Sequence, residues 1–456
     1  MQKKVVLVGA GINGLIFANL LVKKGYEVRL IESSPSIGGN FKAVAVGSNE
    51  YDRGLYLPQL TGCDEIDSIF VDGQDVNLRR GTEKDIAGNI FEGVLNDRSL
   101  FIDISKNKNL AQRIFFEMSE KYGVDTNKTR SVNKYFKNRF GETAYNEIFQ
   151  NILQNLVSHD IDDYDVAALK VFHLTRLVLF DELSSARIKQ NEFFNARVAY
   201  PNQMTIPDNF ISDKTPFVYP KKYGLYNLIS GLEKQLFNKS VSIETDVIIK
   251  DFEIRNNKIN FVKVETRNGI VNYETDHLVW CGNTYTLDKL LNIKTNILNK
   301  LDPPVAQEVT YVVTKSPPNS GKTYWVWDYD NNPVMRLSFP HNYSSLKLNG
   351  NYLIVIEHRK GFKHEAVISY LCSRSLIKKK DIITVDTPKE ANRFYYSFTM
   401  NNIKNDRKFL TAINQLSLSN FHLCSAKISQ NVFYLHDLLK DGYSQLKRSG
   451  VLDVNN

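Results

Sequence analysis

The feature that most constrains this sequence is a glycine-rich turn between an apolar run and a helical pattern near the N-terminus. Residues 5–8 are continuously apolar, as in a buried parallel strand. The turn G-A-G-I-N-G follows at 9–14, and apolar residues then recur at helical spacing over 15–22. Gly25 is expected to end that helix, and residues 27–31 to form a second strand. This order of elements predicts the first half of a Rossmann unit.

Each glycine of the turn has a physical role in a dinucleotide-binding unit. Gly9 permits the tight turn, Gly11 lets the backbone approach a pyrophosphate, and Gly14 lets helix and strand pack closely. The amides and the positive dipole end of the helix favour phosphates. Glu32 follows the second strand, where a carboxylate accepts hydrogen bonds from ribose hydroxyls and repels a 2′-phosphate. The pattern therefore predicts binding of an ADP moiety and disfavours NADP.

The same N-terminal stretch superficially resembles a signal peptide, because Lys3 and Lys4 precede an uncharged run at 5–22. Glycines interrupt that run, and it continues into a strand pattern that ends at Glu32. The Rossmann interpretation explains these interruptions and the signal interpretation does not. Elsewhere no stretch of 18 apolar residues occurs, so no transmembrane span is expected.

Composition bounds the architecture and the partners. At 456 residues the chain is too long for one hydrophobic core, so two or three domains are expected. The net charge of +8 fits either a lysine-rich solvated surface or attraction toward an anionic partner. A small anionic substrate ranks first, peripheral contact with a membrane stays open, and nucleic acid is not expected because aromatic and basic residues do not interleave.

Cysteine usage argues against a structural zinc site and against a disulfide scaffold, and no other metal cluster stands out. The four cysteines lie far apart without a C-x-x-C pair, which fits a reducing compartment such as the cytoplasm; they are Cys63, Cys281, Cys372 and Cys424.

A second glycine pair carries a family resemblance. Gly38, Gly39 and Asn40 follow Glu32 at the spacing of the extended dinucleotide motif of FAD-containing oxidases, although a simple Gly-Gly turn is the plain alternative. In that family the pair lets the backbone pass close to the flavin-side pyrophosphate. Residues 219–224 resemble the P-x-x-G helix entry of the same family. The resemblance implies FAD as the cofactor.

In the same family a later segment of the chain also belongs to the FAD-binding domain. Residues 241–248 are expected to form a strand, followed by hairpins at Asn256-Asn257 and Asn268-Gly269 and by a strand before Cys281. The resemblance implies that Val247 lies against the adenine, with its backbone pairing with the base edge.

The end of the chain resembles the last part of the family's FAD domain. Residues 421–427 lie where the family has a strand ending in glycine, and a last helix opens beside Asp437. Ser425 stands in or next to the place of that glycine, so the cofactor pose is expected to differ or its binding to weaken. The family's last helix points its positive end at the flavin.

Within this superfamily the chain resembles amine oxidases, protoporphyrinogen oxidase and UDP-galactopyranose mutase. Gly38-Gly39-Asn40 looks like the mutase form of the pair, and residues 51–61 occupy the place of the mutase segment G-x-H-x-F-H-T. Tyr56 stands where a histidine would be, and the second histidine is absent as well. Arg53 and Tyr56 are expected to face the substrate.

Two further regions are expected to form inserted parts. Residues 105–205 show helical spacing, including 166–177, where His173 is more simply a packed core histidine than a catalytic one. Residues 305–400 contain short β-rich runs. There Arg336 resembles the family's substrate-facing arginine and could grip a phosphate or carboxylate bidentately, or be a surface arginine. Tyr395 is a weaker candidate for the same cavity.

The sequence therefore predicts an α/β protein, with a Rossmann-type FAD-binding domain and an inserted helical and antiparallel β substrate domain. The FAD-binding domain is expected at 1–75, 215–300 and 405–456, the helical insertion at 105–205 and the β domain at 305–400. The predicted function is FAD-dependent hydride transfer on a small anionic substrate, such as a nucleotide-linked sugar. The alternatives are a non-redox flavin-dependent sugar mutase and a non-catalytic binding protein that keeps the fold.

Overall fold

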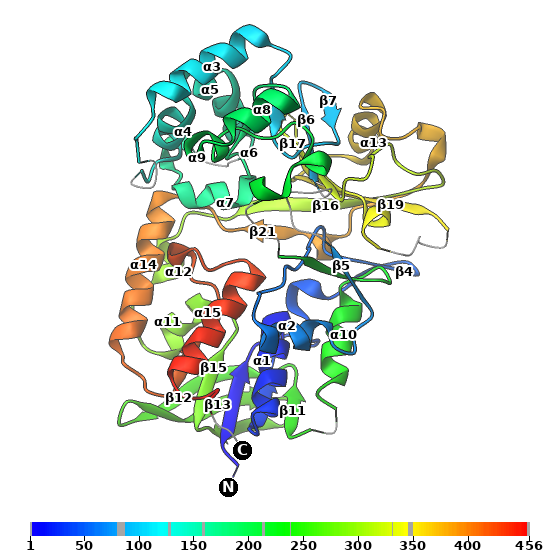
Figure 1. Ribbon diagram of the computed structural model, residues 1–456. Coiled ribbons are helices and arrows are strands. Elements are labelled where there is room, and N and C mark those ends of the chain that lie inside the picture. The colour runs from blue at the N-terminus through cyan, green and yellow to red at the C-terminus, as the bar shows by residue number, and fades with distance from the viewer. Residues whose placement is uncertain are drawn as a thin grey trace. The chain divides into compact units, whose positions relative to one another are not determined.

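A computed structural model describes residues 2–79, 87–125, 129–156, 160–211, 215–237, 239–330, 332–344 and 350–453 (Figure 1). The chain forms two compact units. Unit 1 consists of Met1–Leu78, Thr215–Leu301 and Ile403–Asn456, and unit 2 of Arg79–Lys214 and Asp302–Asn402. Within the described residues no helix has both the length and the apolar character needed to cross a membrane.

Unit 1 is built on a five-stranded parallel sheet with the strand order β11-β2-β1-β15-β22. The strands are β1 (Lys4–Val8), β2 (Glu27–Ile31), β11 (Val241–Glu244), β15 (His277–Trp280) and β22 (Phe421–Leu423). β1 lies in the middle of this order and buries four of its five residues, which explains its continuous apolar run. The predicted Rossmann-type fold is confirmed.

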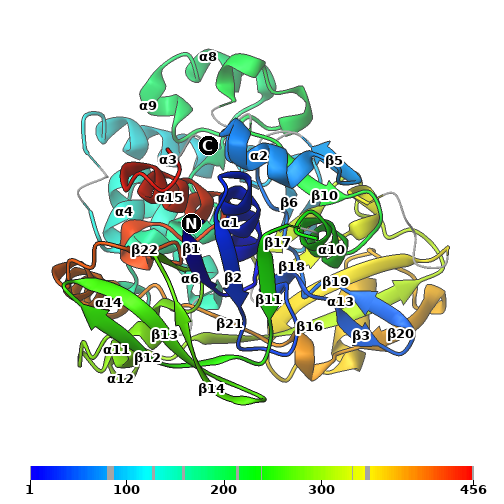
Figure 2. The ribbon, with the colours of Figure 1, turned by 90° about the horizontal axis from the view of Figure 1, so that it is seen from below.

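Helix α1 (Ile12–Lys23) follows β1 and is buried over ten consecutive residues from Ile12 to Leu21. It ends as expected before Gly25, whose φ is +85°, and the N–H of Tyr26 donates to Leu21 O at 3.2 Å. Figure 1 shows α15 (Leu435–Arg448) beside α1, and Figure 2 shows α10 (Tyr226–Lys234) on the other side of α1. The remaining helices of unit 1 are α2 (Asp64–Val71), α11 (Leu287–Leu290), α12 (Ile297–Lys300) and most of α14 (Met400–Gln415).

A second sheet of unit 1 corrects one expected strand. The run 241–248 does not form a single strand: β11 ends at Glu244, and β12 (Ile248–Arg255) begins an antiparallel sheet with β13 (Lys258–Thr266) and β14 (Gly269–Glu274). Asp246, with φ of +57°, turns the chain between the two sheets. The two predicted hairpins are confirmed. The short ribbons β3–β4 (Val44–Val46, Asn49–Tyr51) and β5–β10 (Val76–Arg79, Phe217–Pro220) complete this unit.

Unit 2 contains an eight-stranded sheet in its described part, in the order β20-β16-β19-β18-β17-β6-β7 with β21 beside β16. Among the described strands of this sheet, neighbours are antiparallel except β17 and β6, which are parallel. The strands are β6 (Ala87–Phe91), β7 (Val94–Asn96), β16 (Val305–Thr314), β17 (Trp325–Asp328), β18 (Val334–Ser338), β19 (Tyr352–Arg359), β20 (Ile382–Asp386) and β21 (Arg393–Tyr395). Helix α13 (His364–Ser373) packs on one face through Val367 and Leu371.

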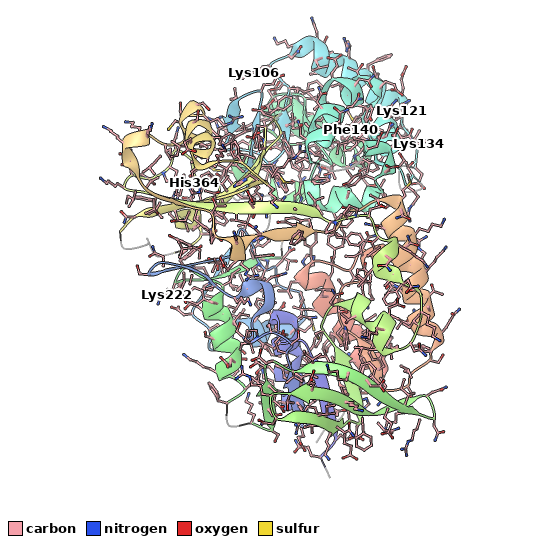
Figure 3. The ribbon with its side chains drawn as sticks, turned by 180° about the vertical axis from the view of Figure 1, so that it is seen from behind. Lys106, Lys121, Lys134, Phe140, Lys222 and His364 are labelled. Atoms are coloured by element: carbon pink, nitrogen blue, oxygen red, sulfur yellow. The ribbon has the colours of Figure 1, made fainter. Side chains whose placement is uncertain are left out.

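The helical part of unit 2 packs a group of phenylalanine rings in its interior. Phe136, Phe140 and Phe149 stack, with ring centroids of Phe136 and Phe149 4.2 Å apart. Figure 3 labels the buried Phe140 together with Lys106 and Lys134, which are both exposed. The helices are α3 (Lys108–Glu120), α4 (Val132–Phe140), α5 (Glu142–Ala144), a π-helix (Tyr145–Phe149), α6 (Gln150–Leu156), α7 (Leu169–Phe172), α8 (Glu182–Ile188) and α9 (Glu192–Asn195).

The expected helix over 166–177 is wrong in its second half. Helix α7 ends at Phe172 because His173 takes a left-handed conformation with φ of +53°. Leu177 lies instead in β9 (Leu177–Val178), which pairs in parallel with β8 (Ile102–Asp103). Helical spacing alone did not detect this stop, since neither glycine nor proline marks it.

Candidate functional site

The first glycine turn of unit 1 leaves no room for a side chain at two of its three glycines. A Cβ on Gly14 would lie 1.9 Å from Gly9 O, and one on Gly9 would lie 3.0 Å from the carbonyl carbon of Cys281. Neither position can hold a side chain without movement of the backbone. A Cβ on Gly11 would meet nothing within 4 Å, so the space over the start of α1 is open. The first amides of α1, which have no carbonyl partner within the helix, lie at this end of it.

The second glycine pair lies directly against the first turn. The N–H of Gly38 donates to Ala10 O at 2.8 Å, and Gly11 and Gly38 form a parallel bridge. Gly38 and Gly39 have φ of +102° and +55°, which explains why glycines stand there. A Cβ on Gly39 would lie 3.3 Å from Gly11 Cα. The two glycine segments, one with Gly9, Gly11 and Gly14 and the other with Gly38 and Gly39, therefore lie backbone against backbone, and we call them the glycine cradle. Asn40 is exposed in the turn that follows.

Glu32 closes the cradle at the end of β2. Its Oε2 accepts a hydrogen bond from the N–H of Ala10 at 2.8 Å, and its Oε1 accepts from the N–H and the hydroxyl of Ser34, both at 2.9 Å. A carboxylate oxygen has more than one acceptor site, so Glu32 is fixed in place and keeps acceptor capacity. Val247 is buried, and its N–H donates to Glu32 O at 3.0 Å. Only the carbonyl of Val247 could then pair with an adenine edge.

The chain after β22 reaches the same side of the sheet. Asn13, in the first turn of α1, donates from Nδ2 to Cys424 O, whereas its buried Oδ1 has no partner among the described residues. Ser425 is buried and its hydroxyl lies 2.8 Å from that of Thr284. Asp437 lies in the first turn of α15. Sequence reasoning assigned no role to Asn13, although its place inside the G-A-G-I-N-G turn is a signal that could have singled it out.

The segment that holds Arg53 and Tyr56 is tied down by a buried carboxylate. Asp52 is 4% exposed and accepts hydrogen bonds from the N–H of Leu225 at 2.7 Å and from the hydroxyl of Tyr219. The ring of Tyr56 packs on Phe41, with centroids 5.3 Å apart, which places it beside the second glycine pair. The Nε of Arg53 is buried without a hydrogen-bond partner in the described part of the chain. Sequence reasoning missed the positioning role of Asp52.

Arg336 of unit 2 is not a surface arginine. Its Nη2 lies 2.7 Å from Glu357 Oε2 and 2.9 Å from Oε1, and the two side chains are 17% and 4% exposed. Glu357 also lies 3.4 Å from Arg393 Nη1, and the hydroxyl of Tyr395 accepts from Arg393 at 2.9 Å. Burial is the largest single influence and lowers the pKa of Arg336, but Glu357 and Tyr395 together raise it by more, so that the pKa is raised. The bidentate grip expected for a ligand is therefore occupied by Glu357.

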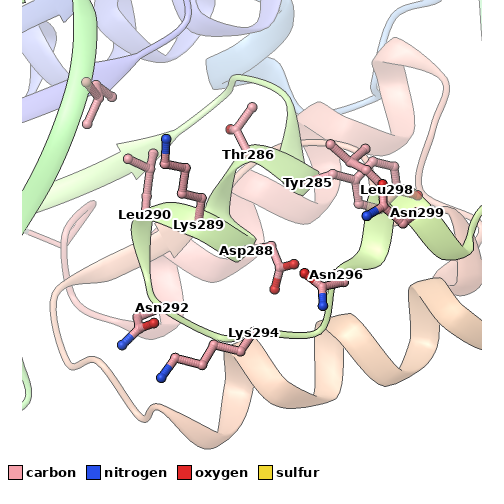
Figure 4. A pocket seen from close by; sticks show the side chains of 11 residues that line it. Tyr285, Thr286, Asp288, Lys289, Leu290, Asn292, Lys294, Asn296, Leu298 and Asn299 are labelled. Atoms are coloured by element: carbon pink, nitrogen blue, oxygen red, sulfur yellow. The ribbon is translucent and has the colours of Figure 1, made fainter.

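A hollow of about 640 Å³ in unit 1 lies away from the predicted residues (Figure 4). Asp288 orders the loop that lines it, accepting from the N–H and the hydroxyl of Thr295 at 2.8 Å. Asn292, Lys294 and Asn296 all have positive φ. The hollow is lined by Ile249, Tyr285, Thr286, Asp288, Lys289, Leu290, Asn292, Lys294, Asn296, Leu298 and Asn299. None of the predicted cofactor or substrate residues is among these.

Comparison with known proteins agrees with the glycine cradle. Residues 7–59 match the family described as NAD(P)-binding Rossmann-like domain. Over 74 residues the chain is 38% identical to 1-hydroxycarotenoid 3,4-desaturase of Flavobacterium sp. (strain P99-3). That match covers 16% of this chain and 15% of the relative's length.

Two solved structures share the fold of the whole chain. Reduced UDP-galactopyranose mutase matches with a TM-score of 0.68 and 14% identity, over 99% of this chain and 97% of the mutase chain. Wild-type putrescine oxidase bound to putrescine matches with a TM-score of 0.62 and 12% identity, over 100% of both chains. The expected likeness to the mutase and to amine oxidases is confirmed for the fold.

Proposed function

We propose that this chain is an FAD-dependent oxidoreductase that acts by hydride transfer on a small anionic substrate. The glycine cradle carries the proposal. Gly11 leaves open space at the start of α1, and the Gly38–Gly39 backbone lies against it. An ADP moiety fits such a cradle, because both glycine segments offer backbone to the phosphates and Glu32 offers acceptors to a ribose.

The residues that would hold the cofactor all belong to unit 1. The turn at Gly9 to Gly14 would bind the pyrophosphate, and Glu32 the ribose hydroxyls, while the carbonyl of Val247 would meet the adenine. Bound flavin supplies the acceptor or donor of hydride. The negative charge of Glu32 disfavours a 2′-phosphate. Asn40, Ser425 and Asp437 are proposed as further cofactor contacts, because the family resemblance places them beside the flavin end.

An anionic substrate is supported by charge. The chain carries a net charge of +8, and Arg53 in unit 1 has a buried Nε without a partner among the described residues. Tyr56 and Tyr395 offer hydroxyl groups at the two expected substrate positions. A buried guanidinium nitrogen that lacks a protein partner is stabilised when an oxyanion binds to it.

A sugar mutase is the second candidate. The likeness to UDP-galactopyranose mutase and the sequence Gly38-Gly39-Asn40 favour it, whereas Tyr56 at the place of the mutase histidine disfavours it. Single reduction of the purified holoenzyme followed by turnover without an electron acceptor would establish the mutase. Consumption of acceptor in step with substrate would establish the oxidoreductase. A protein that neither holds nor takes up flavin would contradict both and leave a non-catalytic binding role.

The cradle itself is tested by Gly11→Ala. The new methyl group has room in the protein but enters the space proposed for the pyrophosphate. We expect the variant to fold normally and to retain far less flavin than the parent. Ser36→Ala, at an exposed position of the same loop, should keep its flavin. Full flavin occupancy in Gly11→Ala would contradict the proposed site.

A further inference from the structure

One face of the large sheet in unit 2 carries a group of polar side chains. Strand register places Trp327, Arg336 and Glu357 side by side on β17, β18 and β19. Their neighbours Val326, Leu337 and Ile356 point to the opposite face, where they pack with α13 in the apolar core. We call the first side, with Trp325, Trp327, Arg336, Ser338 and Glu357, the Arg336 face.

Two buried polar groups on the Arg336 face lack partners. The Nε1 of Trp327 and the Oγ of Ser338 have no hydrogen-bond partner among the described residues, although these residues are only 5% and 2% exposed. Burying a polar group without a partner costs roughly 1–3 kcal/mol. An indole N–H only donates. A ligand that satisfies Trp327 must therefore carry an acceptor.

Helix α7 brings a histidine to this face. The ring of Phe172 lies 6.4 Å from that of Trp327, and the hydroxyl of Tyr329 donates to Phe172 O at 3.3 Å. The next residue, His173, ends the helix with φ of +53°. This backbone conformation costs energy for residues other than glycine. Strained backbone of this kind recurs at functional positions.

The ring of His173 differs from the buried rings of unit 2 and unit 1. His173 is partly exposed and has no hydrogen-bond partner among the described residues. In contrast, His358 lies 2.7 Å from the hydroxyl of Thr310 and His422 lies 3.3 Å from His277. Burial, and then the charge of Arg336, lower the pKa of His173 to about 4. The ring is therefore neutral near pH 7 and keeps one nitrogen as an acceptor.

The charged surroundings favour an anion. Arg336 from β18 is the charged group that acts on His173, and around Arg336 lie Glu357 from β19 and Arg393 from β21. Two guanidinium groups thus share one carboxylate. Tyr395 from β21 also acts on Arg336, the hydroxyl of Tyr329 contacts α7 at Phe172, and Lys170 lies on α7 itself. An oxyanion beside Arg336 would offset its effect on the imidazole, and the pKa of His173 would rise.

We propose that a small oxyanion-bearing molecule binds on the Arg336 face between Arg336 and His173, and that His173 takes up a proton as this molecule binds. Trp327 Nε1 and Ser338 Oγ donate hydrogen bonds to the same oxyanion. The proton comes from solvent and forms an N–H bond on the imidazole, and no group is oxidised or reduced. This inference deepens the proposed function. It rests on that function in one respect, namely that the bound molecule is the substrate.

Calorimetry with inorganic phosphate at pH 5.5 tests the inference on the purified full chain with its cofactor. Titrations in two buffers of different ionisation enthalpy measure the protons taken up on binding. We expect uptake in the parent, no uptake in His173→Gln, and phosphate affinity about tenfold lower in that variant, as expected for one lost hydrogen bond to a charged group. Lys170→Gln, on the same helix, should still take up the proton.

The results separate this inference from the proposed function. No phosphate binding, or equal proton uptake in the parent and in His173→Gln, would overturn the inference while flavin content still supports the oxidoreductase. Proton-linked binding that depends on His173 in a protein without flavin would support the site and contradict the oxidoreductase. Ser338→Ala gives a second measure, since a structural role would change stability without lowering phosphate affinity.

Discussion

The glycine cradle of unit 1 and the Arg336 face of unit 2 are built in opposite ways. The cradle is made of backbone from two segments fewer than forty residues from the N-terminus, and its shape depends on missing side chains. The Arg336 face is made of side chains from three strands, and the charged and titratable residues beside it come from segments as far apart as His173 and Arg393. A backbone site leaves a spaced motif in the sequence, whereas a side-chain site is assembled only when distant strands come into register.

Among the substitutions that test this contrast, Glu357→Gln is expected to cause the largest loss of stability. Glu357→Gln leaves Arg336 and Arg393 buried beside a neutral amide, and breaking such a pair costs about 3–5 kcal/mol of unfolding free energy. Chemical denaturation would measure it. Glu142→Gln removes an exposed partner of Lys137 and should change stability by about 0.5 kcal/mol or less. Equal effects of the two substitutions would show that the Glu357 cluster is not tightly buried.

Gly14→Ala should give the next largest effect, now in unit 1. The added Cβ would lie 1.9 Å from Gly9 O, which is backbone and cannot rotate away. Forcing extra atoms into such a contact costs about 3 kcal/mol. Thermal unfolding compared with Gly11→Ala would check it, because both changes add the same methyl group. Similar stability losses in the two variants would mean that the turn adapts and that the cradle is not rigid.

The stability of unit 1 in acid depends on the buried imidazole of His422. Burial, and then the neighbouring His277, lower the pKa of His422 to about 4, below its unfolded value of about 6.5. Its neutral form therefore stabilises the fold above pH 6.5, and this contribution is lost as the pH falls from 6.5 to 4, by at most roughly 3 kcal/mol. His422→Asn should flatten that part of the stability profile of unit 1. A profile as steep as that of the parent would contradict it.

The smallest effect is a change of affinity without a change of fold. Gly11→Ala should weaken flavin binding at least about tenfold, or roughly 1.4 kcal/mol, with unfolding free energy unchanged within about 0.5 kcal/mol. Flavin fluorescence during titration of the stripped protein would measure the affinity. If stability falls together with affinity, the open space at Gly11 belongs to the packing of the protein and not to a ligand.

The sequence was sufficient to predict the fold where the residues of one short segment determine both the local structure and the site. The order β1, glycine turn, α1 and β2 followed from apolar runs and glycine spacing, and the hairpins at Asn256-Asn257 and Asn268-Gly269 from their turn residues. It was insufficient where a residue without a special signature changes the path of the chain. His173 and Asp246 have positive φ although neither is glycine. For this reason the helix predicted over 166–177 and the strand predicted over 241–248 both extend further than the elements in the structure.

The residues of the candidate site also fall into those that the sequence predicts and those that it does not. The glycines of the cradle could be named from spacing, because only glycine fits those positions. The ion pair of Arg336 with Glu357 could not, because strand register alone brings the two residues together. The buried carboxylate of Asp52 was missed for the same reason, since its partners Tyr219 and Leu225 lie more than 160 residues away.

The absorbance spectrum of the purified protein, with the released cofactor identified after denaturation, tests the central claim most directly. The account predicts the visible bands of an oxidised flavin and the release of FAD, with both signals much reduced in Gly11→Ala and retained in Ser36→Ala. A colourless protein that also fails to take up added FAD would contradict the proposal that the glycine cradle holds a flavin.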